Sequence, residues 1–320
     1  LTGMEHDKLL SEYEEKLDEI IKYLEILDDS KVLMQLIKEE LQAVSDEFGD
    51  DRRTVISESQ HDLTVEDLIT EEDRVVTISH SGYAKTQPLS DYQSQHRGGT
   101  GKSATAVKDD DFVEHLLIAS THSTILCFTN LGKVYWLKVY QIPVAGRNSK
   151  GRPMINLLPL DENERINSIL TVSEYDENKF IIMATANGTV KKTSLDQYSR
   201  PRSVGLRAVD LVEGDYLVGS AITDGSSDVM LFSSEGKAVR FSESDVRSVG
   251  RVSKGVRGMR LPTEHKVLSM IIPADNGYAL TVSASGYGKR TNLTEFPTKG
   301  RGGKGMIAMQ ASKRNGPLVG

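Results

Sequence analysis

The residues best suited to chemistry in this chain form a short loop, residues 95–102, with the sequence QHRGGTGK. Its three glycines lack a Cβ, so the backbone can turn with positive φ and press close to a partner. Arg97 and Lys102 place positive charge on the same turn. This combination suits phosphate, because hydrogen bonds from Arg and Lys to phosphate oxygens are strengthened by charge.

Part of this loop, residues 98–103 (GGTGKS), is similar to a nucleotide-binding P-loop, but the rest of that motif is missing. A P-loop carries a glycine five residues before its Gly-Lys pair, where this chain has His96, and it follows a hydrophobic strand, unlike residues 91–95. The seven histidines show no metal-ligand spacing, and no paired carboxylates or Ser-His-Asp order stands out. We therefore expect neither a nucleotide site nor an enzyme that works alone.

Loops of this kind recur five times, each some 14 to 17 residues after another glycine. The preceding glycines are spaced 50, 56, 48 and 50 residues apart and are Gly82, Gly132, Gly188, Gly236 and Gly286. The loops that follow them are residues 95–102, 146–152, 200–207, 250–257 and 298–305. One cationic turn is usual on a soluble protein, but five at one position of a repeat predict a shared binding surface.

Each spacing glycine lies between two runs of β-forming residues, which predicts a strand, a tight turn and a second strand. A further strand follows each basic loop, and an apolar run then leads into the next unit. About four strands in 48 to 56 residues is the scale of a propeller blade. Since one blade cannot bury both of its faces, we expect the units to stack around an axis and share a core.

The chain stops where a sixth unit would begin, because residues 317–320 are similar to the runs that lead into earlier units. Two interpretations stay open: a final unit is missing or truncated, or the array has five units.

The N-terminal residues predict helices. From Glu5 to Phe48 apolar residues alternate three and four apart, the pattern of a packed helix or coiled coil. Asp28 to Ser30 interrupts the pattern with good N-cap residues. We predict a helical segment at residues 1–60, an acidic linker at residues 61–73 and the repeat domain at residues 74–320.

Charge divides the chain in the same way. Residues 1–73 carry 23 acidic and 7 basic residues, a net charge of −16, whereas the rest carries 23 acidic and 32 basic residues, a net charge of +9. The net charge of −7 for the whole chain is therefore no argument against a polyanionic partner. No long apolar run or signal-peptide pattern is present, and Cys127 is the single cysteine, so we expect a cytoplasmic protein without a membrane partner.

Residues 92–103 resemble the signature box of the bacterial DNA gyrase A subunit family, whose usual form is Gln-Arg-Arg-Gly-Gly-Lys-Gly. The five units resemble the C-terminal domain of that family, a six-bladed β-pinwheel that wraps DNA around its rim. The N-terminal helices resemble the end of the family's cleavage core. His96 and Thr100 stand where the family usually has Arg and Lys, so this box has lost two cations.

The resemblance implies an all-β pinwheel with five of six expected blades, preceded by an α-helical segment. It implies a part in ATP-dependent negative supercoiling of double-stranded DNA by a tetramer of two A and two B subunits. The catalytic tyrosine of the family would precede Leu1, and the gyrase B subunits would bind ATP and Mg²⁺, so no catalytic, metal or cofactor residue is expected in this chain. Two alternatives are the pinwheel of the topoisomerase IV A subunit, which acts in decatenation, and a protein-interaction propeller.

The residues that we expect to contact DNA lie in the loops and on the second strands of the hairpins. In the box they are Gln95, Arg97, Gly98, Gly99, Gly101 and Lys102. In the other loops they are Arg147, Lys150, Arg152, Arg200, Arg202, Arg207, Arg251, Lys254, Arg257, Lys299, Arg301 and Lys304. On the second strands they are Lys85, Lys191, Lys192, Lys289 and Arg290.

Overall fold

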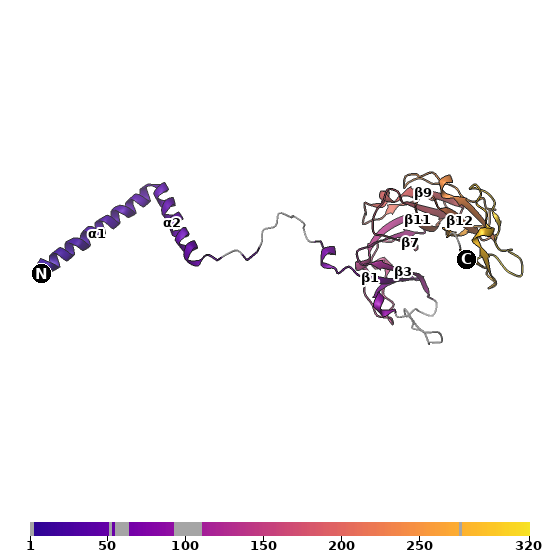
Figure 1. The fold of residues 1–320 in the computed structure, drawn as a ribbon, viewed down its shortest axis with the longest axis horizontal. Helices are drawn as coiled ribbons and strands as arrows, with labels where there is room; N and C mark the ends of the chain where they lie inside the picture. Colours follow the sequence, from indigo (N-terminus) through magenta and orange to yellow (C-terminus); the bar gives the residue numbers. More distant parts are fainter. Residues whose placement is uncertain (1–2, 51–52, 55–63, 93–110, 275–276) are drawn as a thin grey trace. The chain divides into compact units, whose positions relative to one another are not determined.

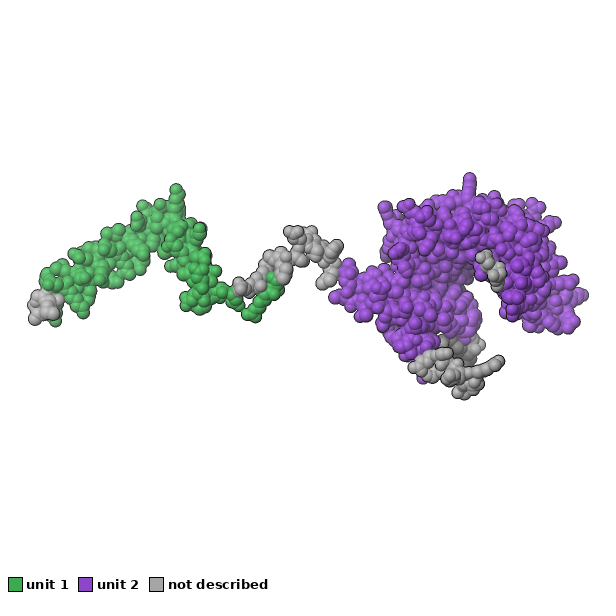
Figure 2. Space-filling model, viewed as in Figure 1, with its two compact units in different colours: residues 1–62 green, residues 63–320 purple. Residues whose placement is uncertain are grey.

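The computed structural model describes residues 3–50, 53–54, 64–92, 111–274 and 277–320. The chain forms two compact units, residues 1–62 and residues 63–320 (Figure 2). The box at residues 95–102 lies outside the described residues, so its predicted contacts stay predictions.

The first unit consists of two helices, α1 (Gly3–Asp28) and α2 (Ser30–Phe48). Asp29 separates them with extended backbone, and its Oδ1 atom accepts a hydrogen bond of 2.8 Å from the backbone N–H of Lys31. A side-chain acceptor at this position satisfies one of the free N–H groups of the first helical turn. The predicted helical pair and its interruption are confirmed.

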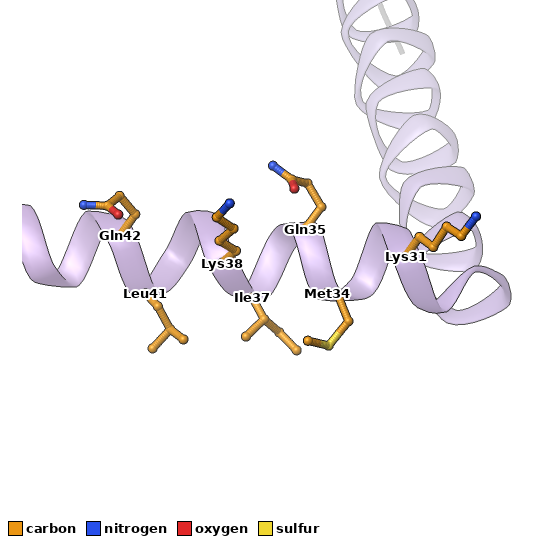
Figure 3. Close-up of a pocket in the computed structure, with 7 residues that line it drawn as sticks. All are labelled: Lys31, Met34, Gln35, Ile37, Lys38, Leu41 and Gln42. Atoms are coloured by element: carbon orange, nitrogen blue, oxygen red, sulfur yellow. The ribbon is translucent and has the colours of Figure 1, made fainter.

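The apolar stripe of α2 is exposed within the first unit. Met34, Ile37 and Leu41 project from one side of the helix, whereas Gln35 and Gln42 project from the other (Figure 3). Met34 and Leu41 are 63% and 65% exposed. Neither α1 nor α2, the two long helices in the described part of the chain, is apolar enough to cross a membrane.

The second unit consists of strands joined by tight turns and short 3₁₀ helices. The strands are β1 (Asp73–Ser79), β2 (Tyr83–Pro88), β3 (Val113–Ser120), β4 (Thr124–Thr129), β5 (Lys133–Lys138), β6 (Arg152–Pro153), β7 (Ile166–Val172), β8 (Phe180–Thr185), β9 (Thr189–Ser194), β10 (Leu206–Arg207), β11 (Leu217–Thr223), β12 (Asp228–Ser233), β13 (Lys237–Ser242), β14 (Val256–Arg257), β15 (Val267–Ile271), β16 (Tyr278–Val282), β17 (Gly288–Asn292) and β18 (Met306–Ile307). The 3₁₀ helices are η1 (Glu66–Leu68), η2 (Leu89–Asp91), η3 (Val139–Gln141), η4 (Met154–Asn156), η5 (Leu195–Tyr198), η6 (Glu243–Asp245) and η7 (Leu293–Glu295).

The five predicted hairpins are all present: β1–β2, β4–β5, β8–β9, β12–β13 and β16–β17. The first four hairpins belong to four-stranded antiparallel sheets, with the orders β3-β1-β2-β6, β7-β4-β5-β10, β11-β8-β9-β14 and β15-β12-β13-β18. The fifth hairpin is a two-stranded sheet in the described residues. The sheets follow one another in chain order along an arc (Figure 1). The predicted β-pinwheel architecture is confirmed.

The four strands of one repeat do not form one sheet. The two-residue strands β6, β10, β14 and β18 lie at or just beyond the ends of the basic loops of repeats two to five, and each pairs with the hairpin of the preceding repeat. The end of each of these loops therefore pairs with the sheet of the preceding repeat. Our expectation of about four strands per repeat is correct, but their assignment to a single blade is not.

Apolar clusters fill the spaces between successive sheets. Ile125 and Cys127 of β4 pack in one cluster with residues of β1 and β2, whereas Leu126 and Phe128 of the same strand pack in the next cluster with residues of β8. All four side chains are fully buried. The strand alternates between two cores, as the period of two requires. Four clusters between the sheets thus replace the single shared core that we expected.

The second half of the predicted linker packs on the second unit. Nε2 of His122 lies 2.8 Å from the carbonyl oxygen of Ile69, and Oγ1 of Thr121 donates to the carbonyl of Thr70 at 2.9 Å. Glu66 forms an ion pair of 2.7 Å with Lys138. Residues 66–73, which belong to the predicted acidic linker, are therefore bonded to the first two sheets.

Candidate nucleic-acid interface

The basic loops are held against the preceding sheet by a glycine at one matched position. Gly151 and Gly255 have φ of 84° and 92°. A Cβ added to Gly151 would lie 2.2 Å from the carbonyl oxygen of Ala84, and one added to Gly255 would lie 2.5 Å from that of Val190. Both the positive φ and the close approach exclude other residues. The backbone freedom predicted for these loops is thus used to dock them on the neighbouring blade.

The fourth and fifth basic loops are bonded to the residues that follow the preceding loop. These backbone hydrogen bonds connect the third, fourth and fifth repeats in chain order. They run from the N–H of Asp210 to the carbonyl of Ser253 (3.4 Å), from the N–H of Gly302 to that of Gly258 (2.7 Å), and from the N–H of Arg260 to that of Gly303 (2.9 Å). These loops lie side by side, as a shared binding surface requires.

Most of the predicted loop cations are exposed. Those with exposed side chains are Lys150, Arg152, Arg200, Arg202, Arg207, Lys254, Arg257, Lys299, Arg301 and Lys304, and the half-buried ones are Arg147 and Arg251. Within the described ranges, Arg207 alone among these twelve has an ion-pair partner, Asp210 at 3.3 Å. The rest of this positive charge has no carboxylate partner in the described structure, so it is available to an external polyanion.

Arg301 differs from the other loop cations, because its guanidinium is bonded to the protein backbone. Its Nε and one terminal nitrogen donate to the carbonyls of Asp245 (2.9 Å) and Arg257 (3.1 Å). Arg301 therefore also ties the fifth loop to the fourth repeat.

Three predicted contacts on the second strands need correction. Lys85, Lys191 and Lys192 are only 1%, 1% and 7% exposed. Their ammonium groups donate to backbone carbonyls inside the molecule. We expected these lysines to contact DNA, but backbone of the next repeat covers their ammonium groups. A buried ammonium cannot reach a phosphate, so we remove these three lysines from the candidate contacts.

The two cations of the fifth hairpin, Lys289 and Arg290, are exposed. The guanidinium carbon of Arg290 lies 3.9 Å from the ring centroid of Tyr278, and Nζ of Lys289 donates to the carbonyl of Ala308 at 3.3 Å. Both stay candidates for DNA contact.

No cluster of three or more His, Cys, Asp or Glu that could hold a metal ion occurs among the residues that the structure describes. The thiol of Cys127 is buried, and burial raises its pKa to about 12.

Comparison with known proteins distinguishes the gyrase A and topoisomerase IV families. A family model described as "DNA gyrase C-terminal domain, beta-propeller" matches residues 73–120, 123–173, 179–224, 227–274 and 277–320. The chain belongs to this family. Its five matches coincide with the five repeats, so the gyrase domain begins where the first strand begins.

Relatives of this chain include DNA gyrase A subunits from several bacteria. The subunit from Salmonella typhimurium is 54% identical over 320 residues, that from Escherichia coli 53% over 320 residues and that from Pseudomonas aeruginosa 52% over 362 residues. Each alignment covers the whole of this chain but only 36%, 37% and 39% of the relative. The chain therefore spans less than two fifths of the length of these gyrase subunits, and the resemblance found in its sequence is confirmed.

Solved structures support the fold of this gyrase domain. The C-terminal domain of DNA topoisomerase IV matches with a TM-score of 0.67 and 28% identity, over 78% of this chain and 76% of that one. A DNA gyrase A C-terminal domain matches with a TM-score of 0.63 and 26% identity, over 77% and 81%. Fold alone does not separate the two families, whereas identities of 52% to 54% with gyrase A subunits favour gyrase.

Proposed function

We propose that the second unit binds double-stranded DNA along its basic loops and wraps the duplex around the edge that they form. The observation that carries this proposal is the hydrogen bonding of the fourth and fifth basic loops to the residues that follow the loop before each of them, because it places the exposed cations of three loops side by side. Contacts would go mainly to phosphates, so binding would depend little on base sequence and strongly on salt.

Several blades are needed for wrapping. Bending 20 to 30 base pairs by 40° to 90° costs roughly 1 to 6 kcal/mol, which one loop would offset poorly. Cations on four described loops, spread along an arc of sheets, distribute this cost over many contacts (Figure 1). A curved edge also favours the bent duplex over a straight one, since only the bent duplex touches every loop.

In the whole protein, the unit would serve a cytoplasmic gyrase that introduces negative supercoils at the expense of ATP. The support is the identity of 52% to 54% with gyrase A subunits. A second A subunit and two gyrase B subunits would complete the enzyme, and the gyrase B subunits would hold ATP and Mg²⁺. The chain described here would supply neither the tyrosine that cuts DNA nor an ATPase site.

The test is relaxation of circular DNA by a separate topoisomerase in the presence of the chain. If the unit wraps DNA, relaxation at low salt will trap a nonzero linking difference that grows with the protein-to-DNA ratio. The same reaction at about 0.5 M salt is the control, because screening of phosphate contacts removes the wrap. A linking number equal to that of DNA relaxed alone, under both conditions, would favour a protein-interaction propeller.

A further inference from the structure

Lys85 and Lys191 occupy the same place in their repeats, three residues after the hairpin glycine, and both are 1% exposed. Nζ of Lys85 donates to three carbonyls of the next repeat's basic loop: Gly146 (3.1 Å), Arg147 (3.1 Å) and Ser149 (2.9 Å). Neither lysine has a carboxylate partner in the described residues. Both ammonium groups donate hydrogen bonds to backbone carbonyls.

Lys191 lies between two basic loops. Its Nζ donates to the carbonyl of Ala208, the residue that follows the third loop (2.5 Å), and to that of Arg251 in the fourth loop. Lys289, at the same position of the fifth repeat, donates to the carbonyl of Ala308, which corresponds to Ala208. The contact therefore recurs in separate blades.

The contacts of Lys85 determine which way the loop's amides face. In a trans peptide the C=O and the following N–H point in opposite directions, and no cis peptide occurs in the described residues. Since three loop carbonyls face the lysine, the following N–H groups, those of Arg147, Asn148 and Lys150, face away from it. None of these three amides has an acceptor among the described residues. Outward amides beside exposed cations form a typical anion-binding concavity.

A buried ammonium group loses its hydration, which disfavours its charged form. The hydrogen bonds from Lys85 and Lys191 to the carbonyls must therefore compensate for this loss. Burial lowers the pKa of Lys85. Burial, together with the Arg251 guanidinium, lowers the pKa of Lys191 to about 8, against an opposing effect of Asp210. Hydrogen bonds from a charged donor are stronger than those from a neutral donor, and they offset this cost. An apolar side chain at either place would avoid the cost but would leave loop carbonyls unpaired.

We propose that Lys85 and Lys191 are positioning residues that hold the basic loops of the following repeats in the conformation that receives phosphate. This inference rests on the proposed function, and it replaces the direct DNA contact that we first assigned to both lysines. Two repeats carry Tyr135 and Val239 in place of this lysine, three residues after the hairpin glycine. After Tyr135, the next basic loop packs through Gly205 on the Tyr135 ring. After Val239, the next basic loop is bonded to the preceding repeat through Arg301.

The test compares Lys85→Met with Lys150→Met, which removes an exposed cation from the loop that Lys85 holds. DNA affinity is measured across a salt series with the purified chain. Lys150→Met should lower the salt slope by about 0.9, the value for one lost phosphate contact. Lys85→Met should lower it by roughly 2 to 3, because Arg147, Lys150 and Arg152 lose their common placement. A decrease of about 0.9 or less for Lys85→Met would contradict the positioning role.

A second readout does not involve DNA. Trypsin cleaves after Arg147 and Lys150. A loop that has lost its hydrogen bonds to Lys85 should be cut at least several times faster in Lys85→Met than in the wild-type chain. An unchanged cleavage rate in Lys85→Met would overturn this inference. Failure of the wild-type chain to bind DNA would instead overturn the proposed function. If Lys85→Met does not fold, the same cleavage test is applied to Lys191→Met. The rate of cleavage after Arg251 and Lys254 then tests the positioning role.

Discussion

Replacing Arg200, Arg202 and Arg207 by Gln is expected to weaken DNA binding on the order of 100-fold at about 0.15 M salt and to lower the salt slope by about 2.7. The three side chains are exposed on one loop. Each would release about one counterion on meeting a phosphate. The ion pair of Arg207 with Asp210 is exposed, so it competes weakly with a phosphate.

The matched control is Lys22, Lys31 and Lys38, three exposed cations of the first unit. Their replacement by Gln changes the net charge by the same amount, and we expect no more than a small loss of affinity. Equal losses from both triple variants would show that overall charge, rather than the loops, governs binding. The affinity is measured by titration of a labelled duplex at several salt concentrations.

Gly236→Ala is expected to lower the free energy of unfolding by roughly 3 kcal/mol or more. Gly236 has φ of 82°, and a Cβ added there would lie 2.1 Å from the carbonyl oxygen of Met309. Its own carbonyl accepts hydrogen bonds from Ala308 and Met309, the residues that follow the exchanged strand β18. The substitution therefore strains the turn and also separates two repeats.

Gly82→Ala isolates the contribution of the strain. Gly82 has φ of 80° at the corresponding turn, but a Cβ there would meet no atom within 4 Å. Its replacement should cost about 1 kcal/mol, the usual penalty for a left-handed Ala. Equal losses in urea denaturation of the two variants would mean that contact between the repeats contributes little at this position.

The sequence predicted the elements of this fold better than their pairing. The hairpins were predicted from glycines spaced 48 to 56 residues apart, because tight turns need positive φ and alternation is a local signal. The exchange of strands such as β10 (Leu206–Arg207) was missed, because a two-residue strand carries no periodicity that would identify its partner.

The basic loops were found from their composition, but the roles of Lys85 and Lys191 were not. A lysine on an alternating strand usually faces solvent. Here the loop that covers Lys85 comes from residues 146–149, about sixty positions further along the chain. No local pattern shows that three carbonyls will gather around that ammonium. The recurring signal was a lysine three residues after the hairpin glycine.

The most direct test of DNA wrapping is whether a single duplex passes the loops in their order along the chain. The chain carries Lys150→Cys, and this cysteine is joined by a disulfide to a thiol-bearing phosphate at a known position of the DNA. The native Cys127 does not compete, because it is buried and its pKa is raised to about 12. A photo-cross-linking side chain then replaces Arg202, Lys254 or Lys304 in turn. We predict cross-links at increasing distances along the DNA from the anchor in that order. Cross-links without order, or closest to the anchor from Lys304, would contradict wrapping along the loops.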